Sequence, residues 1–374
     1  NKMKYTNSWV EISKANLEYN LRQFKKLIGS NVKLMSVVKS NAYGHGLLEI
    51  SKICNKNKNV DWFGVVNLEE ALYLRKNKIS KPILVLSYYD LDKKQITLAI
   101  KNNISLVAYN SKQIKYISSI SKKLKKNANL HLKFDSGISR LGVFEKEIIK
   151  LAKLITISNY LKLEGIFTHY ASAEETNQSF TLKQTKLLNE LVSKLNIKVP
   201  LIHAACSAAT LINKKYHLNL IRLGISLYGL YSIENNNLKN KFKLKPILSW
   251  KTKVIQVKSL KKGSTIGYGR TFKVKSNKEI AILRVGYNDG YDRKLSNNSF
   301  VLIKGKKCKL VGRVCMNLIM VDITGKRVKV GDEVILIGKQ GKNIISADQI
   351  AKNLKTINYE VVTRINPLLK RIIK

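Results

Sequence analysis

A lysine stands where an apolar segment of the sequence runs into a glycine-rich turn. Residues 32–38 are mostly aliphatic, a composition that favours a β-strand, and residues 40–46 contain two glycines that flank His45. At such a junction burial disfavours the charged form of Lys39 and lowers its pKa, and a neutral amine can attack an aldehyde. Lys39 is therefore a candidate nucleophile. The alternative, a lysine that ends a strand and points into water, is the commoner case in a chain so rich in lysine.

Other polar residues stand at the ends of later apolar segments. They are Lys133, Asp135 and Arg140 at the end of the segment near 129–135, His169 and Tyr170 at the end of 163–169, His203 and Ser207 around the end of 201–206, and Arg222 and Gly224 at the end of 218–223. If these segments are parallel strands, their ends meet at one rim, so these side chains lie near Lys39. One or two such residues could be chance, but a polar group at each of these ends is harder to dismiss.

The elements that must position these residues alternate between strand and helix. Apolar runs lie near residues 32–38, 61–66, 82–87, 104–109, 129–135, 163–169, 201–206 and 218–223. The stretches between them carry apolar residues at helical spacing, for example at Leu17, Leu21, Phe24 and Ile28 of the first helix. Uninterrupted apolar strands joined by crossover helices indicate a parallel sheet, and eight such units predict a closed (β/α)8 TIM-like barrel. An open doubly wound sheet is the alternative, but no G-x-G-x-x-G motif follows a strand.

The last two strand ends fit phosphate binding. Ser207 offers a hydroxyl, and Gly224 lets backbone N–H groups approach an anion closely, although a simple turn glycine is the alternative. Barrels of this class frequently bind phosphate after strands seven and eight. A reactive lysine across the rim from a phosphate site suggests pyridoxal 5′-phosphate, held by the lysine as a Schiff base.

The pattern changes after three consecutive asparagines at 235–237. From Pro246 onward, short alternating runs are separated by Gly, Asn and Lys pairs, which is typical of a mostly antiparallel β domain, with one short helix near 346–354. We therefore place a barrel domain at 1–240 and a β-rich domain at 241–374. Residues 1–12 contain a strand that could pair with the C-terminal domain.

Residues 38–46 resemble the cofactor-lysine signature of alanine racemases. The resemblance covers essentially the whole chain, with further matching segments at 133–142, 168–173, 222–229, 266–272, 285–291, 312–316 and 357–360. The segments that contain Lys39 and Tyr268 are the most specific. The resemblance implies a cytoplasmic, pyridoxal phosphate-dependent isomerase that interconverts L- and D-alanine, supplies D-alanine for peptidoglycan and acts as a homodimer with shared active sites.

The resemblance also implies roles for individual residues. Lys39 carries the cofactor and is one acid–base group, and the partner subunit's Tyr268 is the opposite one. Two groups on opposite faces suit a reaction that removes the α-proton from one face and returns a proton to the other. Arg222 is expected to face the pyridine nitrogen, and His169 is expected to orient Arg222.

The remaining site residues follow from the same resemblance. Phosphate contacts are expected from Tyr43, Ser207, the backbone at Gly224 and Ile225, and Tyr359. Arg140 and the backbone N–H of the partner subunit's Met316 are expected to hold the substrate carboxylate. Tyr287, Arg293, Arg313 and Tyr359 match a gate over the entrance, and Lys133 matches a lysine that is carbamylated in some members. The chain departs from the usual residues at Cys206, Gly267, Glu174 and Asn317, but at none of the catalytic groups.

The charge is extreme, with 69 Lys and Arg against 24 Asp and Glu and a formal net charge of +45. Binding to nucleic acid or an anionic membrane is one interpretation. However, the excess is almost all lysine, is spread along the whole chain and accompanies abundant Asn and Ile, as AT-rich codons would produce. No basic block with interleaved aromatic residues is present, so we favour a compositional origin and expect no specific nucleic-acid partner.

Other features favour the cytoplasm. No apolar run approaches the ~18 residues that span a membrane, so we expect no membrane partner. The first eight residues lack the apolar core of a signal peptide. The four cysteines, at 54, 206, 308 and 315, lie far apart without ligand spacing, which predicts neither disulfides nor a metal site.

Three other functions stay open at this point. A racemase of broader amino-acid specificity would use the same residues. A barrel-type decarboxylase is less favoured, because those enzymes generally pair the pyridine nitrogen with a carboxylate, whereas Arg222 is found here. A non-catalytic protein that binds pyridoxal phosphate on the same barrel would lack the second domain and its Tyr268.

Overall fold

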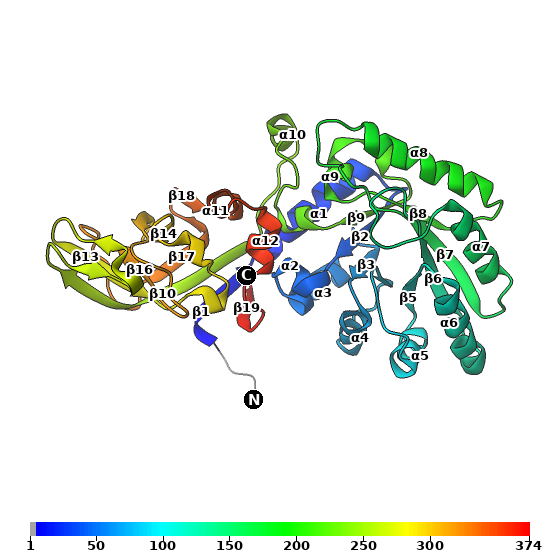
Figure 1. Cartoon of the computed structure of the whole chain (residues 1–374), viewed down its shortest axis with the longest axis horizontal. Helices are drawn as coiled ribbons and strands as arrows, with labels where there is room; N and C mark the ends of the chain where they lie inside the picture. The colour runs from blue at the N-terminus through cyan, green and yellow to red at the C-terminus, as the bar shows by residue number, and fades with distance from the viewer. Residues whose placement is uncertain (1–4) are drawn as a thin grey trace. The chain divides into compact units, whose positions relative to one another are not determined.

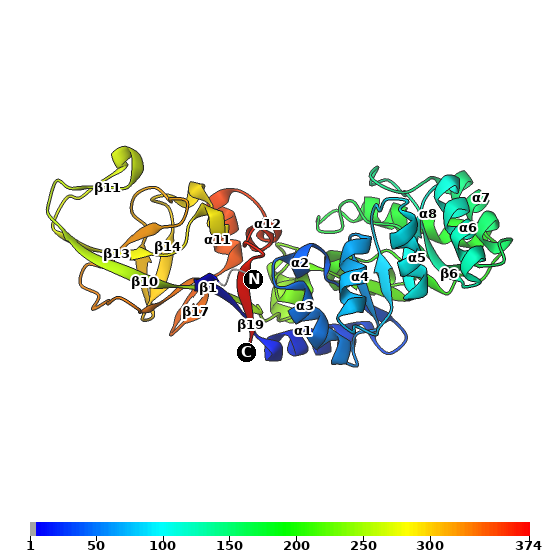
Figure 2. The same cartoon turned by 90° about the horizontal axis from the view of Figure 1, so that it is seen from below.

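The computed structural model describes the backbone of residues 5–374 and the side chains from Ser8 onward, so residues 1–4 of the predicted first domain lie outside the described residues. The chain forms two compact units. The barrel unit comprises residues 16–40 and 50–246. The β unit comprises residues 5–15, 41–49 and 247–374. Figures 1 and 2 show the elements of each unit.

Eight parallel strands form the barrel in the order β8-β7-β6-β5-β4-β3-β2-β9. They are β2 (Lys33–Val37), β3 (Trp62–Val65), β4 (Ile83–Val85), β5 (Ile104–Ala108), β6 (Ala128–Lys133), β7 (Leu161–Phe167), β8 (Leu201–His203) and β9 (Leu220–Leu223). Between β8 and β9, the Asn219 N–H donates to the Ile202 carbonyl (3.4 Å) and the Arg222 N–H to the Ala205 carbonyl (2.9 Å). The nearly closed barrel and all eight predicted strands are thereby confirmed, and the open sheet was wrong.

Helices alternate with these strands. They are α1 (Lys14–Ile28), α3 (Leu47–Lys56), α4 (Leu68–Lys76), α5 (Lys93–Lys101), α6 (Ser111–Leu124), α7 (Glu145–Thr156), α8 (Ser179–Lys194), α9 (Ser207–Ile212) and α10 (Asn236–Lys241). Asn67, Asp92 and Asn110 cap α4, α5 and α6, since each side chain accepts a backbone N–H three residues on. Helices α4 to α7 lie against neighbouring strands of the barrel (Figure 1).

Apolar side chains from five strands fill part of the barrel. Met35, Trp62, Leu84, Leu201 and Leu220 pack into one buried cluster, each from a different strand. Such a layer makes the barrel a packed core rather than a pore, so the polar groups at the strand ends rest on a rigid base.

The β unit has a mostly antiparallel sheet, as predicted. Its strands are β1 (Tyr5–Ile12), β10 (Leu248–Leu260), β11 (Thr265–Ile266), β12 (Phe272–Lys273), β13 (Lys278–Leu283), β14 (Phe300–Ile303), β15 (Lys306–Lys309), β16 (Ile319–Asp322), β17 (Glu333–Gln340), β18 (Asn343–Ile345) and β19 (Leu369–Ile373). Strand β1 pairs antiparallel with β10 and parallel with β19. The predicted short helix is α11 (Ala347–Leu354), capped by Ser346, and α12 (Asn358–Thr363) follows it.

The turn after Lys39 has an unusual hand. In α2 (Lys39–Tyr43), the φ angles of residues 40–43 lie between 51 and 55°. This left-handed conformation costs about 1–2 kcal/mol for each residue with a side chain. Gly44 ends the turn at φ 83°, and a Cβ there would lie 1.9 Å from the Val362 carbonyl oxygen. The sequence predicts a turn at this position but not its hand.

His45 stabilises this turn from within the β unit. Its buried Nδ1–H donates to the carbonyls of Ala42 (3.0 Å) and Tyr43 (2.9 Å). Burial lowers the pKa of His45 to about 4, so the ring is neutral. His45 therefore supports the backbone of the turn.

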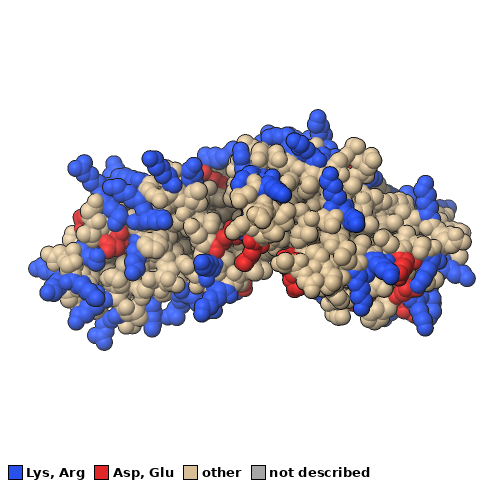
Figure 3. Space-filling view, turned by 90° about the horizontal axis from the view of Figure 1, so that it is seen from above, with Lys and Arg blue, Asp and Glu red and all other residues tan. Residues whose placement is uncertain are grey.

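Basic residues occur on the visible surface of both units (Figure 3). No helix within residues 5–374 has the length and apolar character needed to cross a membrane.

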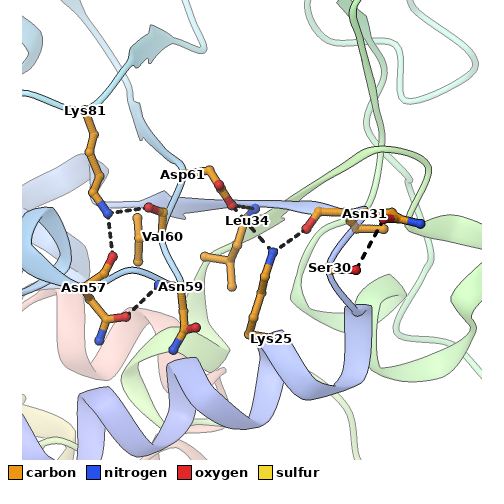
Figure 4. Close-up of polar contacts among 10 residues, drawn as sticks. Lys25, Ser30, Asn31, Leu34, Asn57, Asn59, Val60, Asp61 and Lys81 are labelled. Carbon is orange, nitrogen blue, oxygen red and sulfur yellow. Dashed lines mark hydrogen bonds and ion pairs between the residues drawn. The ribbon is translucent and has the colours of Figure 1, made fainter.

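Lysines also act as structural groups at the starts of the barrel strands (Figure 4). The Lys81 ammonium donates to the carbonyls of Asn57 and Val60 in the loop before β3. Nearby, Lys25 donates to the Val32 carbonyl (2.9 Å), and the Asp61 carboxylate accepts the Leu34 N–H (2.8 Å).

We predict that Lys81→Met lowers the free energy of unfolding by about 1–3 kcal/mol, because two partly buried carbonyls lose their donor. Urea unfolding followed by circular dichroism measures this change. Lys58→Met is the matched control, since Lys58 is exposed in the same loop, and we expect a change within about 0.5 kcal/mol. Equal stability of the two variants would contradict the structural role of Lys81.

Candidate active site

The barrel unit brings several of the predicted site residues together at the ends of its strands. Lys39 follows β2, Lys133 ends β6, His169 follows β7 and Arg222 lies in β9. Arg140 lies in the loop after β6, and its charge lowers the pKa values of Lys39, Lys133 and His169. These five groups therefore share one electrostatic environment.

Lys39 has the lowered pKa that the sequence predicts. The largest cause is burial, followed by the positive charge of Arg140, while the carboxylate of Glu70 acts in the opposite direction. Glu70 also fixes the backbone on both sides of the strand end, since it accepts the N–H groups of Ser40 (2.6 Å) and Val66 (3.0 Å). The lysine is thus half-buried and held on an ordered turn.

Arg222 is the most strongly held side chain of the site, and only 5% of it is exposed. Its Nη1 donates to His203 Nδ1 (2.8 Å), and its Nη2 donates to the carbonyls of Thr168 and Ala204 (2.8 Å each). Nη2 also lies 3.1 Å from Nδ1 of His169. Burial and the Arg222 charge hold the pKa of His169 well below its usual range, so the Nδ1 atom of a neutral His169 shares one of the two Nη2 hydrogens with a carbonyl. His169 is therefore placed to orient the guanidinium.

Backbone donors converge beside Ser207. The Ser207 hydroxyl accepts the N–H groups of Gly224 (3.0 Å) and Ser226 (3.3 Å), and all three residues are buried. Ile225 lies between these two N–H groups. Because these two amides donate to the hydroxyl oxygen, the Ser207 O–H is oriented to donate its own proton, which is the interaction that a phosphate oxygen accepts.

These residues fit pyridoxal 5′-phosphate. An aldehyde needs an amine of lowered pKa, which Lys39 supplies, and the phosphate needs donors, of which the Ser207 hydroxyl is one. Arg222 carries guanidinium donors and no acceptor, which suits an unprotonated pyridine nitrogen.

Lys133 has cationic neighbours on several sides. Its pKa is lowered to about 8; burial is the largest cause, the charges of Arg140, Arg222 and Lys39 act in the same direction, and the carboxylate of Asp135 acts in the opposite one. Asp135 accepts the N–H groups of Gly137 and Ser139, which orders the loop that carries Arg140. A neutral amine is what reaction with carbon dioxide requires, and carbamylation of Lys133 stays a prediction.

The other predicted residues lie in the β unit. Tyr268 opens the short turn η3 (Tyr268–Arg270) between β11 and β12, and 70% of it is exposed. Gly267 precedes it at φ 72°, which explains a glycine at this position. Met316 is 55% exposed and Tyr287 43% exposed, while Tyr43 and Tyr359 pack with ring centroids 6.0 Å apart. Because Tyr268, Met316 and Tyr287 are exposed, a partner subunit can contact them.

The sequence did not assign roles to three polar residues of the barrel, the buried His203 and His131 and the half-buried Glu164. His203 was recognised only as the end of a strand, and His131 and Glu164 were given no role. One signal was available, because His131 lies two residues before Lys133 and therefore faces the same side of its strand.

Comparisons with known proteins cover almost the whole chain. The family described as "Alanine racemase, N-terminal domain" matches residues 12–232, and "Alanine racemase, C-terminal domain" matches residues 247–373. An alanine racemase of Halothermothrix orenii is 38% identical over 97% of this chain and 96% of its own length.

Solved structures agree in fold with this chain. The alanine racemase of Clostridium difficile 630 has a TM-score of 0.91 and 36% identity, over 100% of this chain and 97% of its own. A histidine racemase of Leuconostoc mesenteroides also has a TM-score of 0.91, with 26% identity over 100% of this chain and 99% of its own. Solved structures with this fold are therefore named as racemases of at least two amino acids, alanine and histidine.

We predict that Ser207→Ala weakens binding of pyridoxal 5′-phosphate at least about tenfold, since a hydrogen bond to a charged group contributes about 1.5–3 kcal/mol. Binding of pyridoxal, which lacks the phosphate, should change little. Absorbance titrations of the apoprotein with both compounds measure the difference. Cys206→Ala is the neighbouring control, and an equal loss for both compounds would exclude Ser207 from phosphate binding.

Proposed function

The chain belongs to the alanine racemase family, and on that premise we propose that it interconverts L-alanine and D-alanine with pyridoxal 5′-phosphate. The observation that supports this most directly is the buried Arg222 with its donors to His203, Thr168 and Ala204. An arginine that faces the pyridine nitrogen favours racemisation over decarboxylation, in which a carboxylate is expected.

The cofactor, when bound, withdraws electrons from the amino acid and makes its α-proton acidic. The residues of the chain determine where that proton goes. Lys39, with its lowered pKa, can hold a proton on its Nζ atom and releases it more readily than an ordinary lysine. Arg222 holds its protons too tightly to transfer one to the pyridine nitrogen, which would keep the electron withdrawal of the cofactor moderate. This limits competing reactions such as transamination.

We propose that the second acid–base group is the partner subunit's Tyr268 in a homodimer. The exposure of Tyr268 supports this, because a phenol that moves protons must be reached by a substrate or a partner. Arg140 and the backbone N–H of the partner subunit's Met316 are proposed to hold the substrate carboxylate. Tyr43 and Tyr359 are proposed to contact the phosphate together with Ser207, Gly224 and Ile225. Arg293 and Arg313 are proposed to join Tyr287 and Tyr359 in a gate.

A second candidate is a racemase of another amino acid. The similarity in structure to a histidine racemase, at 26% sequence identity, makes histidine the amino acid to test. Both candidates use the same acid–base residues and differ only in the side-chain pocket. For the alanine-specific enzyme, we further propose that D-alanine serves peptidoglycan synthesis in the cytoplasm. Rescue of a D-alanine auxotroph by this chain would support that role, and failure of an active enzyme to rescue it would contradict it.

We predict that, in D₂O, either alanine enantiomer exchanges its α-proton for deuterium and inverts its centre. Nuclear magnetic resonance and chiral chromatography measure exchange and inversion, and a panel that includes histidine tests side-chain specificity. Formation of carbon dioxide would support a decarboxylase, and formation of pyruvate and ammonia alone would contradict a racemase. A faster reaction with histidine would favour the second candidate.

We predict that Tyr268→Phe slows α-proton exchange from one alanine enantiomer by about 10²–10⁴-fold and exchange from the other much less. The asymmetry arises because each face of the substrate has its own acid–base group. Net racemisation falls in both directions, since each direction needs both groups. Lys39→Ala is the comparison variant and should lose the visible absorption of bound cofactor, which Tyr268→Phe should keep. Mild, symmetric loss in Tyr268→Phe would contradict the two-base assignment.

A further inference from the structure

A line of hydrogen bonds continues from Arg222 into the barrel. His203 accepts from Arg222 at Nδ1 (2.8 Å), and its Nε2 lies 3.0 Å from Nδ1 of His131. Nε2 of His131 lies 3.2 Å from the Glu164 carboxylate, which also accepts from the Ser105 hydroxyl (2.5 Å). Both histidines are fully buried. Arg222 is thus joined to a carboxylate through two imidazole rings.

An irregularity in the sheet places Glu164 at the end of this line. Between β6 and β7, Leu130 pairs with Leu163 but His131 pairs with Gly165, so the register passes over Glu164. Such a bulge re-aims a side chain that the regular alternation would point elsewhere. Gly165 makes room for the ring, since a Cβ there would lie 2.3 Å from Nδ1 of His131. The sequence Glu164-Gly165 therefore fits both the carboxylate and the imidazole.

The hydrogen bonds determine which ring nitrogens carry protons. A guanidinium only donates, so Nδ1 of His203 is bare and its proton lies on Nε2. That proton can only be donated to a bare Nδ1 of His131, so His131 carries its proton on Nε2 and donates to Glu164. Burial and the Arg222 charge hold the pKa of His203 well below its usual range, which agrees with a neutral ring.

Aromatic contacts keep the rings in these orientations. The His203 ring stacks on Phe167 at a centroid distance of 4.8 Å and an interplanar angle of 3°. The His131 ring meets Trp62 edge-on at 5.7 Å, and the Arg222 guanidinium carbon lies 5.4 Å from the centre of the Phe167 ring. Neither imidazole can rotate freely to exchange its nitrogens.

We propose that Glu164 is a positioning residue for Arg222, acting through the fixed tautomers of His131 and His203. Without an acceptor at Glu164, one of two results follows. Either the buried Nε2–H of His131 is left without a partner, or the rings change tautomer and His203 places an N–H against the donors of Arg222. Each result is unfavourable in a buried site and loosens the guanidinium. The kinetic part of this inference rests on the proposed function, whereas the tautomers do not.

The test compares Glu164→Gln with Glu164→Leu in the holoenzyme. Glutamine keeps an oxygen acceptor for His131 and Ser105, and leucine removes it while keeping a similar volume. Nitrogen-15 NMR of histidine-labelled protein separates protonated from bare ring nitrogens, and the chain has only five histidines to assign. The absorption maximum of bound cofactor reports on the position of Arg222 independently of activity, and kcat and KM report on its catalytic effect.

We expect His203 and His131 to be protonated at Nε2 in the unchanged protein and in Glu164→Gln. In Glu164→Leu we expect His203 to lose its single tautomer, the cofactor absorption to shift and kcat to fall about tenfold with little change in KM, a loss of the size that outer-shell substitutions produce. Glu164→Gln should keep kcat within about threefold.

Other results would overturn the proposal. A proton on Nδ1 of His203 in the unchanged protein contradicts it outright, even if Glu164→Leu fails to fold. Unchanged nitrogen-15 shifts in Glu164→Leu, or equal losses of kcat in the two variants, contradict it as well. Absence of racemase activity in the unchanged protein would remove only the proposed function, because the tautomers and the cofactor absorption are measured without turnover.

Discussion

A buried guanidinium cannot lose its charge, so the surrounding protein must supply acceptors for it. Arg222 receives them from two neighbouring strand ends, as the carbonyl of Thr168 after β7, the carbonyl of Ala204 after β8 and the ring of His203 at the end of β8. These groups lie together only because β9 closes the barrel beside β8. The position of β9 beside β8, which closes the barrel, therefore also places Arg222 next to its acceptors.

The same charge shapes the chemistry of its neighbours. Burial is the largest cause of the lowered pKa values of Lys133 and His169, and the charges of Arg222, Arg140 and Lys39 act in the same direction on both. Two arginines remain charged, so the lysines and the histidine are the groups that respond by favouring their neutral forms. A site with this excess of positive charge attracts anions, and both a phosphate group and an amino-acid carboxylate are anions. The electrostatics that make Lys39 reactive thus also favour the ligands on which it would act.

The sequence predicts the features that depend on local pattern. The eight strands and the lowered pKa of Lys39 follow from apolar runs and from the residues at their ends, whereas the contact of His169 with Arg222 was implied by the family resemblance. The line through His203, His131 and Glu164 does not, because it depends on a bulge that passes over Glu164 in the pairing of two strands. Alternation along one strand would not reveal which residue the neighbouring strand skips. Similarly, residues 41–49 belong to the β unit although they lie between two strands of the barrel, and only long-range contacts define that grouping.

The left-handed turn after Lys39 shows how such long-range contacts decide local structure. Nothing in the residues Ser40, Asn41, Ala42 and Tyr43 favours four positive φ angles in succession, although Asn tolerates one. Strain of this kind persists only where surrounding contacts determine the backbone. Glu70 supplies one such contact at Ser40, and His45 supplies two at the carbonyls of Ala42 and Tyr43. Because these contacts begin at the residue after Lys39, the strained turn leaves the lysine little freedom to change its position at the strand end. The histidine between two glycines, which marks this segment in the sequence, therefore supports the backbone of the strained turn.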